Sequence, residues 1–169
     1  MAFLAGIINA GPTKVIMEMQ PVVVNFRWLD PQANQDLSLP AYQSAFAAGM
    51  DVCAAVAEPI ILGQNDIVLI STGFAVSIPA GYELQVRPRS GLAIKHGISI
   101  VNSPGTIDAD YRGEVKIGLI NLGSAPYTVC RGDRIAQLIL APVSRAIWRV
   151  VDNLDETDRQ DGGFGHTGI

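Results

Sequence analysis

Several short segments of this chain combine side chains that could bind or cleave a phosphorylated ligand. The last of them, Arg159–Ile169, contains the guanidinium of Arg159, the ring of Phe164, the hydroxyl of Thr167 and four glycines. A guanidinium can hold phosphate oxygens, an aromatic ring can stack on a base, and unhindered backbone N–H groups can bind a polyanion. Because glycine-rich chain ends are commonly just flexible, the segment predicts either an arm that closes over a ligand or a plain mobile terminus.

A second segment, Arg87–Ala93, follows a β-rich run and opens the one stretch that looks able to form a short helix. Ser90 lies where a helix N-cap is expected, so the N–H groups around it would point outward and, with Arg89, could hold a phosphate. The lysine and the spacing of a Walker loop are absent. An ordinary serine cap beside surface arginines is the alternative interpretation.

A third segment, Asn102–Gly113, lies between two predicted strands and is typical of a hairpin. Asp108 and Tyr111 fall three residues apart near its tip. A half-buried carboxylate there could orient and deprotonate a water, and the tyrosine ring could pack against a sugar. The alternative is a polar loop whose aspartates are simply solvated.

Two further segments are weaker on their own. Ala47–Ala54 places Asp51 at the start of a strand, where an inert turn cap is the default explanation. Arg131–Leu138 places Gln137 inside an apolar run, so its amide either faces solvent or reaches into a site. The Arg-Gly-Asp tripeptide of the same segment is interpreted as a coincidental turn into a strand.

The elements that must position these groups are many short strands separated by turn residues. The predicted strands are Val22–Trp28, Ile67–Ile70, Phe74–Ile78, Tyr82–Val86, Ile98–Val101, Val115–Asn121, Tyr127–Val129, Ile135–Leu140 and Ile147–Val151. A spacing near ten residues with almost no helical periodicity indicates a β-sandwich or barrel. Only Ser90–Lys95 is expected to be helical, with Gly97 ending it. The chain therefore reads as one all-β domain.

Composition excludes several classes of protein. Of 169 residues, 49% are apolar and 17% charged, which argues against disorder, and the net charge of −4 without a long basic run argues against binding nucleic-acid polymers. Cys53 and Cys130 lack metal or disulfide spacing and are interpreted as small buried hydrophobic residues, and His96 and His166 form no metal pattern. The apolar start, Met1–Ala10, is too short to span a bilayer and lacks a signal-peptide pattern. We expect a soluble, cytoplasmic protein that does not interact with membranes.

Taken in order, the segments AGMDVCA, RPRSGLA, GTIDADYRG, RGDRIAQLIL and RQDGGFGHTG resemble the five motifs of the trimeric deoxyuridine triphosphatase (dUTPase) family. The resemblance covers about residues 39–168. It implies an all-β, jelly-roll-like β-sandwich of the β-clip type and a homotrimer whose active sites are each shared by three chains. The single domain divides into an N-terminal extension over residues 1–20, a β core over residues 21–158 and a glycine-rich C-terminal arm over residues 159–169.

The resemblance further implies that the protein hydrolyses dUTP to dUMP and pyrophosphate with Mg²⁺, which limits uracil incorporation into DNA and supplies dUMP for dTMP synthesis. Asp108 would be the catalytic base and Asp51 would meet the metal through water. The substrate-binding residues it implies are Arg89, Ser90, Gly91, Asn102, Thr106, Ile107, Asp108, Tyr111, Lys116, Gln137, Arg159, Phe164, Gly165, His166 and Thr167.

Each implied role follows the family pattern. Arg89, Ser90, Gly91 and Gln137 would hold the phosphates, and Lys116 would contact the nucleotide. Asn102 and the backbone of residues 106–108 would read uracil, while Tyr111 would exclude a 2′-hydroxyl. In the arm, Arg159 would reach the γ-phosphate, Phe164 would stack on uracil, and Gly165, His166 and Thr167 would add phosphate contacts.

The departures from the pattern are small. Gln160 stands where the family usually has glycine, Val52 replaces a common leucine, and residues 1–20 have no assigned role. The dCTP deaminases share the fold and the trimer but carry a different catalytic set. A bifunctional deaminase and a non-catalytic relative that serves as a regulator remain alternatives, although Asp108, Tyr111 and the glycine tail are intact.

Overall fold

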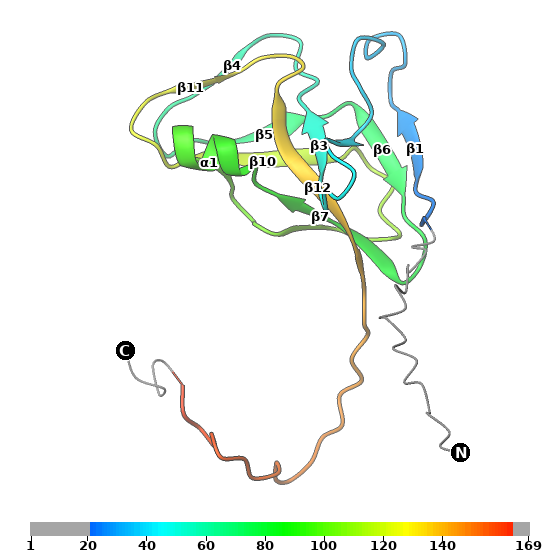
Figure 1. Cartoon of the computed structure of the whole chain (residues 1–169), viewed down its shortest axis with the longest axis vertical. Helices are drawn as coiled ribbons and strands as arrows, with labels where there is room; N and C mark the ends of the chain where they lie inside the picture. Colours follow the sequence, from blue (N-terminus) through cyan, green and yellow to red (C-terminus); the bar gives the residue numbers. More distant parts are fainter. Residues whose placement is uncertain (1–20, 164–169) are drawn as a thin grey trace, which may run out of the picture.

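The computed structural model describes residues 21–163, and the regular secondary structure within them is almost entirely β-strand (Figure 1). The strands are β1 Asn25–Trp28, β2 Ala41–Tyr42, β3 Met50–Cys53, β4 Ile60–Leu62, β5 Ile67–Ser71, β6 Phe74–Ser77, β7 Tyr82–Arg87, β8 Ile98–Ile100, β9 Gly105–Ile107, β10 Lys116–Asn121, β11 Tyr127–Val129 and β12 Arg134–Pro142. The helix α1 spans Ser90–His96. The predicted all-β, jelly-roll-like sandwich is confirmed. No helix among the described residues is long and apolar enough to cross a membrane.

The strands form four antiparallel sheets. The largest has the order β2-β3-β12-β7-β9, and the others are β5-β10-β8, β11-β4 and β1-β6. β12 lies at the centre of the large sheet, where Gln137 is paired with Asp51 on β3 and with Arg87 on β7. Residues from three segments far apart in the sequence are thereby placed side by side.

The core follows from the two-residue periodicity of strands. On β7, Leu84 and Val86 are buried, whereas Glu83, Gln85 and Arg87 lie on the opposite face. The same alternation elsewhere adds the fully buried side chains of Phe74, Leu62, Ile70, Ile98, Ile117, Leu119, Ile135, Leu138, Val52, Val115 and Val129. The large sheet therefore has one apolar face against the core and one polar face.

The short helix begins differently from the prediction. Its N-cap is Arg89, no side chain caps it, and Ser90 is its first helical residue. The expectation of a Ser90 cap was therefore wrong by one position, because the extended backbone of β7 continues through Arg89 and leaves the Ser90 hydroxyl unused as a cap. The predicted end is confirmed, since Gly97 adopts φ of 70° and donates to the carbonyls of Ala93 and Leu92.

Most predicted strands are confirmed with small shifts of their ends, but Ile147–Val151 forms no strand. Ile147, Trp148 and Val150 are each more than 90% exposed, and the segment beyond β12 leaves the body of the chain (Figure 1). β-branched and aromatic residues favour a strand only where a partner strand is present. The strands β2, β4 and β9, which have two or three residues each, were missed because so few residues carry no periodicity.

The Arg-Gly-Asp tripeptide is a structural turn, as expected. Its backbone closes with Asp133 N–H donating to the Cys130 carbonyl at 3.1 Å. The Arg131 guanidinium donates to both carboxylate oxygens of Asp36, at 2.8 and 2.7 Å, and these hydrogen bonds hold the pKa of Asp36 below its usual value. Cys130 is exposed in this turn and Cys53 is only half-buried, so the interpretation of both cysteines as buried hydrophobic residues was wrong for Cys130 and holds only in part for Cys53.

Asn121 is the buried polar residue that ties three parts of the sandwich together. Its side chain is fully buried, and its Nδ2 donates to the carbonyls of Leu62 and Ala125 at 3.0 and 2.9 Å. Its Oδ1 accepts from Gly123 N–H at 2.9 Å. A buried amide with every partner in place stabilises the fold, and removing it leaves those partners unsatisfied.

We predict that Asn121→Ala lowers the free energy of unfolding by about 2–4 kcal/mol, because the buried Leu62 carbonyl, the Ala125 carbonyl and the Gly123 N–H group lose their partners. Urea unfolding followed by circular dichroism measures the change. Asn25→Ala, at an exposed position on β1, is the matched control and should shift stability by less than about 0.5 kcal/mol. Equal effects of the two variants would contradict the role of Asn121.

Candidate active site

The candidate phosphate-binding residues come together at one end of β7. Arg89, Ser90 and Gly91 follow β7 directly, while Asp51 and Gln137 lie on the neighbouring strands β3 and β12. All five line one open cleft of about 460 Å³. The sequence prediction that these three segments converge agrees with this geometry.

Arginine side chains dominate this cleft, which we call the arginine cleft. Arg89 and Arg134 both contact the carboxylate of Asp51. Arg89 Nε lies 3.1 Å from Oδ1, and Arg89 Nη2 lies 3.1 Å from Oδ2. Arg134 Nη1 also lies 3.1 Å from Asp51 Oδ2. Two guanidiniums on one carboxylate leave net positive charge, which suits a phosphate chain. Arg134 was not among the predicted site residues, although its place at the start of β12 opposite β3 could have indicated it.

The sequence left open whether the Gln137 amide faces solvent or reaches into a site. Its Nε2 donates to the Pro88 carbonyl at 2.9 Å, so the amide reaches into the arginine cleft. A Cβ at Gly49 would collide with the Gln137 side-chain oxygen. The glycine before Met50 is therefore required for the close approach of this amide.

A second set of predicted residues gathers at β9 and the start of β10. Thr106, Ile107, Asp108, Tyr111 and Lys116 line a cleft of about 480 Å³, which we call the nucleoside cleft. The flanking strands β8 and β10 pair as the hairpin prediction required. β9, however, lies inside the expected loop and pairs with β7 of the other sheet. Residues 105–107 of the loop are therefore held by pairing with β7, and Asp108 directly follows the paired segment.

Glu114 also lines this cleft, whereas Asn102 lies beside β9 and is not among its lining residues. Asn102 is exposed, and a Cβ at Gly105 would lie 3.1 Å from its Nδ2, so the amide lies directly over the backbone of β9. Glu114 lines the nucleoside cleft with Lys116 and pairs with it at 3.4 Å. Glu114 was not predicted as a site residue. Its place two residues before Lys116, which begins β10, is the signal that could have identified it.

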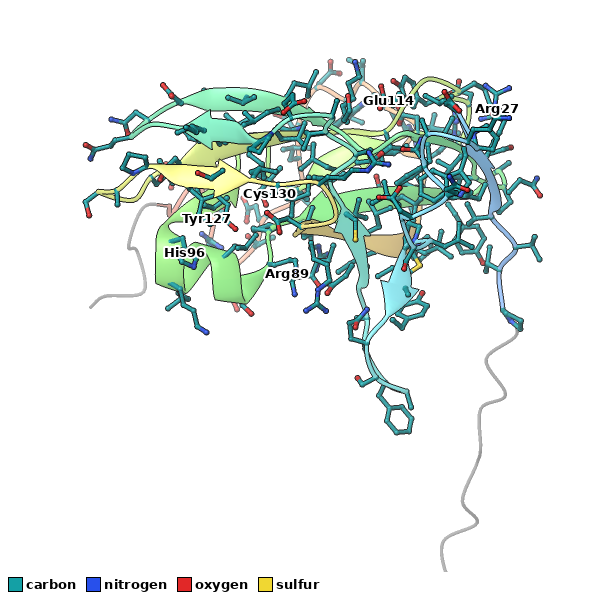
Figure 2. The ribbon with its side chains drawn as sticks, turned by 90° about the horizontal axis from the view of Figure 1, so that it is seen from above. Arg27, Arg89, His96, Glu114, Tyr127 and Cys130 are labelled. Carbon is teal, nitrogen blue, oxygen red and sulfur yellow. The ribbon has the colours of Figure 1, made fainter. Side chains whose placement is uncertain are left out.

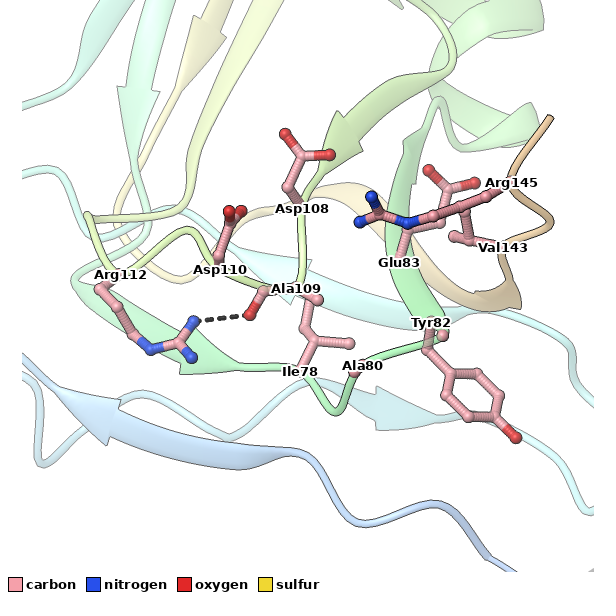
Figure 3. A pocket seen from close by; sticks show the side chains of 11 residues that line it. Ile78, Ala80, Tyr82, Glu83, Asp108, Ala109, Asp110, Arg112, Val143 and Arg145 are labelled. Carbon is pink, nitrogen blue, oxygen red and sulfur yellow. Dashed lines mark hydrogen bonds between the residues drawn. The ribbon is translucent and has the colours of Figure 1, made fainter. Parts of the chain in front are cut away.

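Asp108 also borders a larger cleft of about 590 Å³ on its other side (Figure 3). Glu83 and Arg145 line that cleft to one side of Asp108, and Asp110 and Arg112 to the other. Arg112 Nη1 donates to the carbonyls of Ala109 and Tyr111, at 2.7 and 2.8 Å, so it braces the loop. Asp108 itself is exposed in the single chain, not half-buried.

The arginine cleft and the nucleoside cleft lie at opposite ends of β7. β9 runs antiparallel to β7 and pairs Ile107 with Leu84, so Asp108 follows at the beginning of β7, whereas Arg89 lies just beyond its end. Six residues of extended chain, from position 83 to position 89, span about 20 Å. Figure 2 shows the same separation, with Glu114 and Arg89 on opposite sides of the body.

Only the start of the glycine-rich arm falls within the described residues. Arg159 is exposed, and its Nε donates to the Gly162 carbonyl at 2.7 Å. Gln160 has φ of 45°, in the left-handed region that favours glycine, which agrees with the glycine usual at this position in the resembled family. Phe164, Gly165, His166 and Thr167 lie outside the described residues.

The acidic side chains are compatible with a metal ion that is coordinated mainly by the phosphates of a bound substrate. Residues 21–163 contain no group of three or more histidine, cysteine or acidic side chains able to coordinate an ion. Mg²⁺ keeps several waters and commonly uses one carboxylate together with substrate phosphates. Asp51, whose oxygens already accept from two arginines, suits contact through water better than direct coordination.

The chain is similar to known proteins along most of its length. Residues 35–168 match the family model described as dUTPase. A deoxyuridine 5'-triphosphate nucleotidohydrolase of Desulfotalea psychrophila is 62% identical over 86% of this chain and 97% of its own length. One from Maricaulis maris is 55% identical over 89% of this chain and 99% of its own.

Solved structures show the same fold. A mutant dUTPase of Staphylococcus bacteriophage 80alpha with dUpNHpp superposes with a TM-score of 0.76 at 24% identity, covering 87% of this chain and 99% of that one. A mutant dUTPase from phage phi11 of S. aureus, whose description refers to coordination of a structural Mg(II) ion, gives a TM-score of 0.68 at 24% identity over 79% of this chain and 99% of that one.

Gly91 offers a test of the arginine cleft. A Cβ at Gly91 would meet no atom within 4 Å, and alanine is the better helix former by about 1 kcal/mol. We predict that Gly91→Ala leaves the melting temperature unchanged or higher but weakens binding of a non-hydrolysable triphosphate about tenfold, because the methyl group obstructs the N–H groups at the start of α1. Calorimetric titration measures the affinity. Lys95→Ala on the same helix is the control, and unchanged binding by Gly91→Ala would remove this residue from the site.

Proposed function

This chain belongs to the dUTPase family and hydrolyses dUTP to dUMP, and we propose that it does so with Asp108 as the base at sites shared between copies of the chain. The separation of the two clefts carries this proposal. A base must act within hydrogen-bonding distance of the water that it activates, and that water must approach the α-phosphorus closely. Within one chain the phosphate-binding arginines lie about 20 Å from Asp108, which is too far.

A second copy therefore supplies the arginine cleft to the nucleoside cleft of the first. The exposed apolar segment beyond β12 supports assembly, because Ile147, Trp148 and Val150 would otherwise remain in water. Closed rotational symmetry makes every such contact equivalent and leaves no unused cleft. We infer a homotrimer from the family resemblance, with the arm of the third copy reaching each site.

The chemistry needs few covalent steps. The carboxylate of Asp108 accepts a proton from water as the water oxygen attacks the α-phosphorus. The bond from that phosphorus to the bridging oxygen of the leaving pyrophosphate breaks, and dUMP and pyrophosphate result. Arg89, the N–H groups of Ser90 and Gly91, and the Gln137 amide hold the phosphate oxygens and neutralise the charge that builds on the leaving group.

Selection of the nucleoside is assigned to the opposite end of β7. Asn102 and the backbone of Thr106 and Ile107 would hydrogen-bond the uracil edge; that Thr106 and Ile107 line the nucleoside cleft supports this assignment. Tyr111 forms the wall of the nucleoside cleft on which the deoxyribose would pack, where a 2′-hydroxyl would be crowded. Lys116 lies beside it and contacts the nucleotide.

Magnesium and the arm complete the proposed site. Mg²⁺ would be held by the triphosphate, with Asp51 contacting its water shell, and would supply charge neutralisation and a defined phosphate geometry. Arg159 would reach the γ-phosphate end. Phe164 would stack over uracil while Gly165, His166 and Thr167 contact phosphates, so that closure excludes bulk water.

We predict that Asp108→Asn retains dUTP binding but lowers kcat about 10²–10⁴-fold, because an amide cannot accept the proton of the attacking water. Pyrophosphate release measures turnover, and calorimetry with a non-hydrolysable analogue measures binding. Asp110→Asn, an exposed neighbour in the same loop, is the matched control and should keep most activity. Near-normal turnover by Asp108→Asn would exclude this residue as the base.

Sharing of sites predicts complementation between two inactive variants. Asp108→Asn and Arg89→Ala should each be inactive alone, but subunits mixed in equal amounts by unfolding and refolding together should regain about a quarter of wild-type turnover. The reason is statistical: one ordered pairing in four joins an intact Asp108 to an intact Arg89. Mixtures that remain inactive, with mixed oligomers verified by mass spectrometry, would show that each site is built from one chain.

A further inference from the structure

Glu114 makes three separate contacts at the edge of the nucleoside cleft, although neither the motif comparison nor the proposed function gives it a role. It lies between Tyr111 and Lys116, directly before Val115 and β10. Its side chain is only 19% exposed, which is low for a glutamate that borders an open cleft. Each of its two carboxylate oxygens has a different partner, and its backbone carbonyl has a third.

One carboxylate oxygen is anchored to the fold. Oε1 accepts from the Gly73 N–H at 3.0 Å. Gly73 has φ of 74° in the tight connection between β5 and β6, and its carbonyl accepts from Leu29 N–H at 2.9 Å. The carboxylate is therefore held by rigid backbone that belongs to neither cleft.

The other carboxylate oxygen faces the substrate side. Oε2 lies 3.4 Å from the ammonium of Lys116, whose side chain is 43% exposed. A lysine on a four-carbon stem has many rotamers, and an anchored counter-charge selects the one that places the ammonium along the cleft wall. The charge of Lys116 is also balanced there, so the nucleoside cleft carries less attraction for phosphate than the arginine cleft does.

The backbone of Glu114 orients the tyrosine. Tyr111 Oη donates to the Glu114 carbonyl at 2.9 Å, and a Cβ at Gly113 would collide with the Tyr111 hydroxyl. The ring is 46% exposed, so this hydrogen bond and the adjacent glycine set its orientation. The hydroxyl proton is donated to the protein, so the hydroxyl could offer a substrate only its acceptor lone pairs.

We propose that Glu114 is a positioning residue for the nucleoside half of dUTP, an inference that rests on the proposed function of this cleft. Its carboxylate is anchored by the Gly73 N–H and pairs with the Lys116 ammonium, so it restricts where that ammonium lies. Its backbone carbonyl accepts from the Tyr111 hydroxyl and so orients the ring. Its carboxylate neutralises Lys116, so the triphosphate is directed to the arginine cleft of a second copy instead of the wall beside the sugar.

The substitution Glu114→Gln tests the negative charge of Glu114 separately from its hydrogen bond to the Gly73 N–H. The amide oxygen still accepts from Gly73 N–H, whereas the amide NH₂ faces Lys116 and no longer attracts it. We expect the melting temperature to be unchanged, KM for dUTP to rise about three- to tenfold, and kcat to stay within about twofold, because ground-state positioning is lost while Asp108 is untouched. Steady-state pyrophosphate release measures both constants.

A double-mutant cycle with Lys116→Met identifies the route of the effect. If Glu114 acts through Lys116, Glu114→Gln raises KM in the wild-type background and leaves it unchanged where Lys116 is already methionine. Independent multiplication of the two effects would overturn the proposal, as would an unchanged KM for Glu114→Gln alone.

Two controls keep the outcomes distinguishable. Glu58→Gln removes an exposed glutamate outside both clefts and should leave KM and kcat unchanged. Glu114→Ala, which also removes the acceptor of Gly73 N–H, should lower the melting temperature, whereas Glu114→Gln should not. If wild-type protein did not hydrolyse dUTP, the proposed function itself would fail. Normal wild-type turnover with an unaffected Glu114→Gln variant would defeat only the role of Glu114.

Discussion

The backbone pairing of β7 is the constraint on which the remainder of this structure depends. β7 pairs with β12 on one side and β9 on the other, so it fixes the place of every candidate catalytic residue in the large sheet. Because an extended strand has a nearly constant rise per residue, the distance between its two ends cannot adjust. Asp108 lies by one end and Arg89 by the other. The proposed sharing of sites between copies of the chain rests on this separation.

The same strand shows how one sheet serves both packing and chemistry. Leu84 and Val86 enter the core, while the residues between them line up on the polar face with Gln137 and Asp51 of neighbouring strands. The buried face supplies the apolar area that stabilises the sheet, and the exposed face supplies groups that can bind phosphate. On this face the single negative charge of Asp51 orders two guanidiniums, so one net positive charge remains.

Around the nucleoside cleft, rigidity comes from a different source. The loop after β9 has little regular structure, yet Arg112 braces its carbonyls and Glu114 ties its far end to the β5–β6 connection. Arg112 and Glu114 each make more than one contact through a single side chain. Such linked contacts restrict a loop more strongly than isolated contacts do. Asp108 directly follows β9 and is exposed to solvent in the single chain.

The sequence by itself determined the chemistry and the fold class. Turn residues spaced near ten apart predicted short strands, and the order of five motifs predicted the dUTPase family, which the comparisons confirm. Local patterns failed where the outcome depends on partners distant in the chain. Ile147–Val151 has strand-forming residues but no strand to pair with. The N-cap is Arg89 instead of Ser90, because the backbone stays extended as far as Arg89. β9 is too short to show a hydrophobic periodicity. The contacts of Arg134 with Asp51 and of Glu114 with Gly73 join segments far apart in the sequence. Only the tertiary structure decided these points, because hydrogen-bonded register between distant segments sets which side chains meet, and no single segment encodes it.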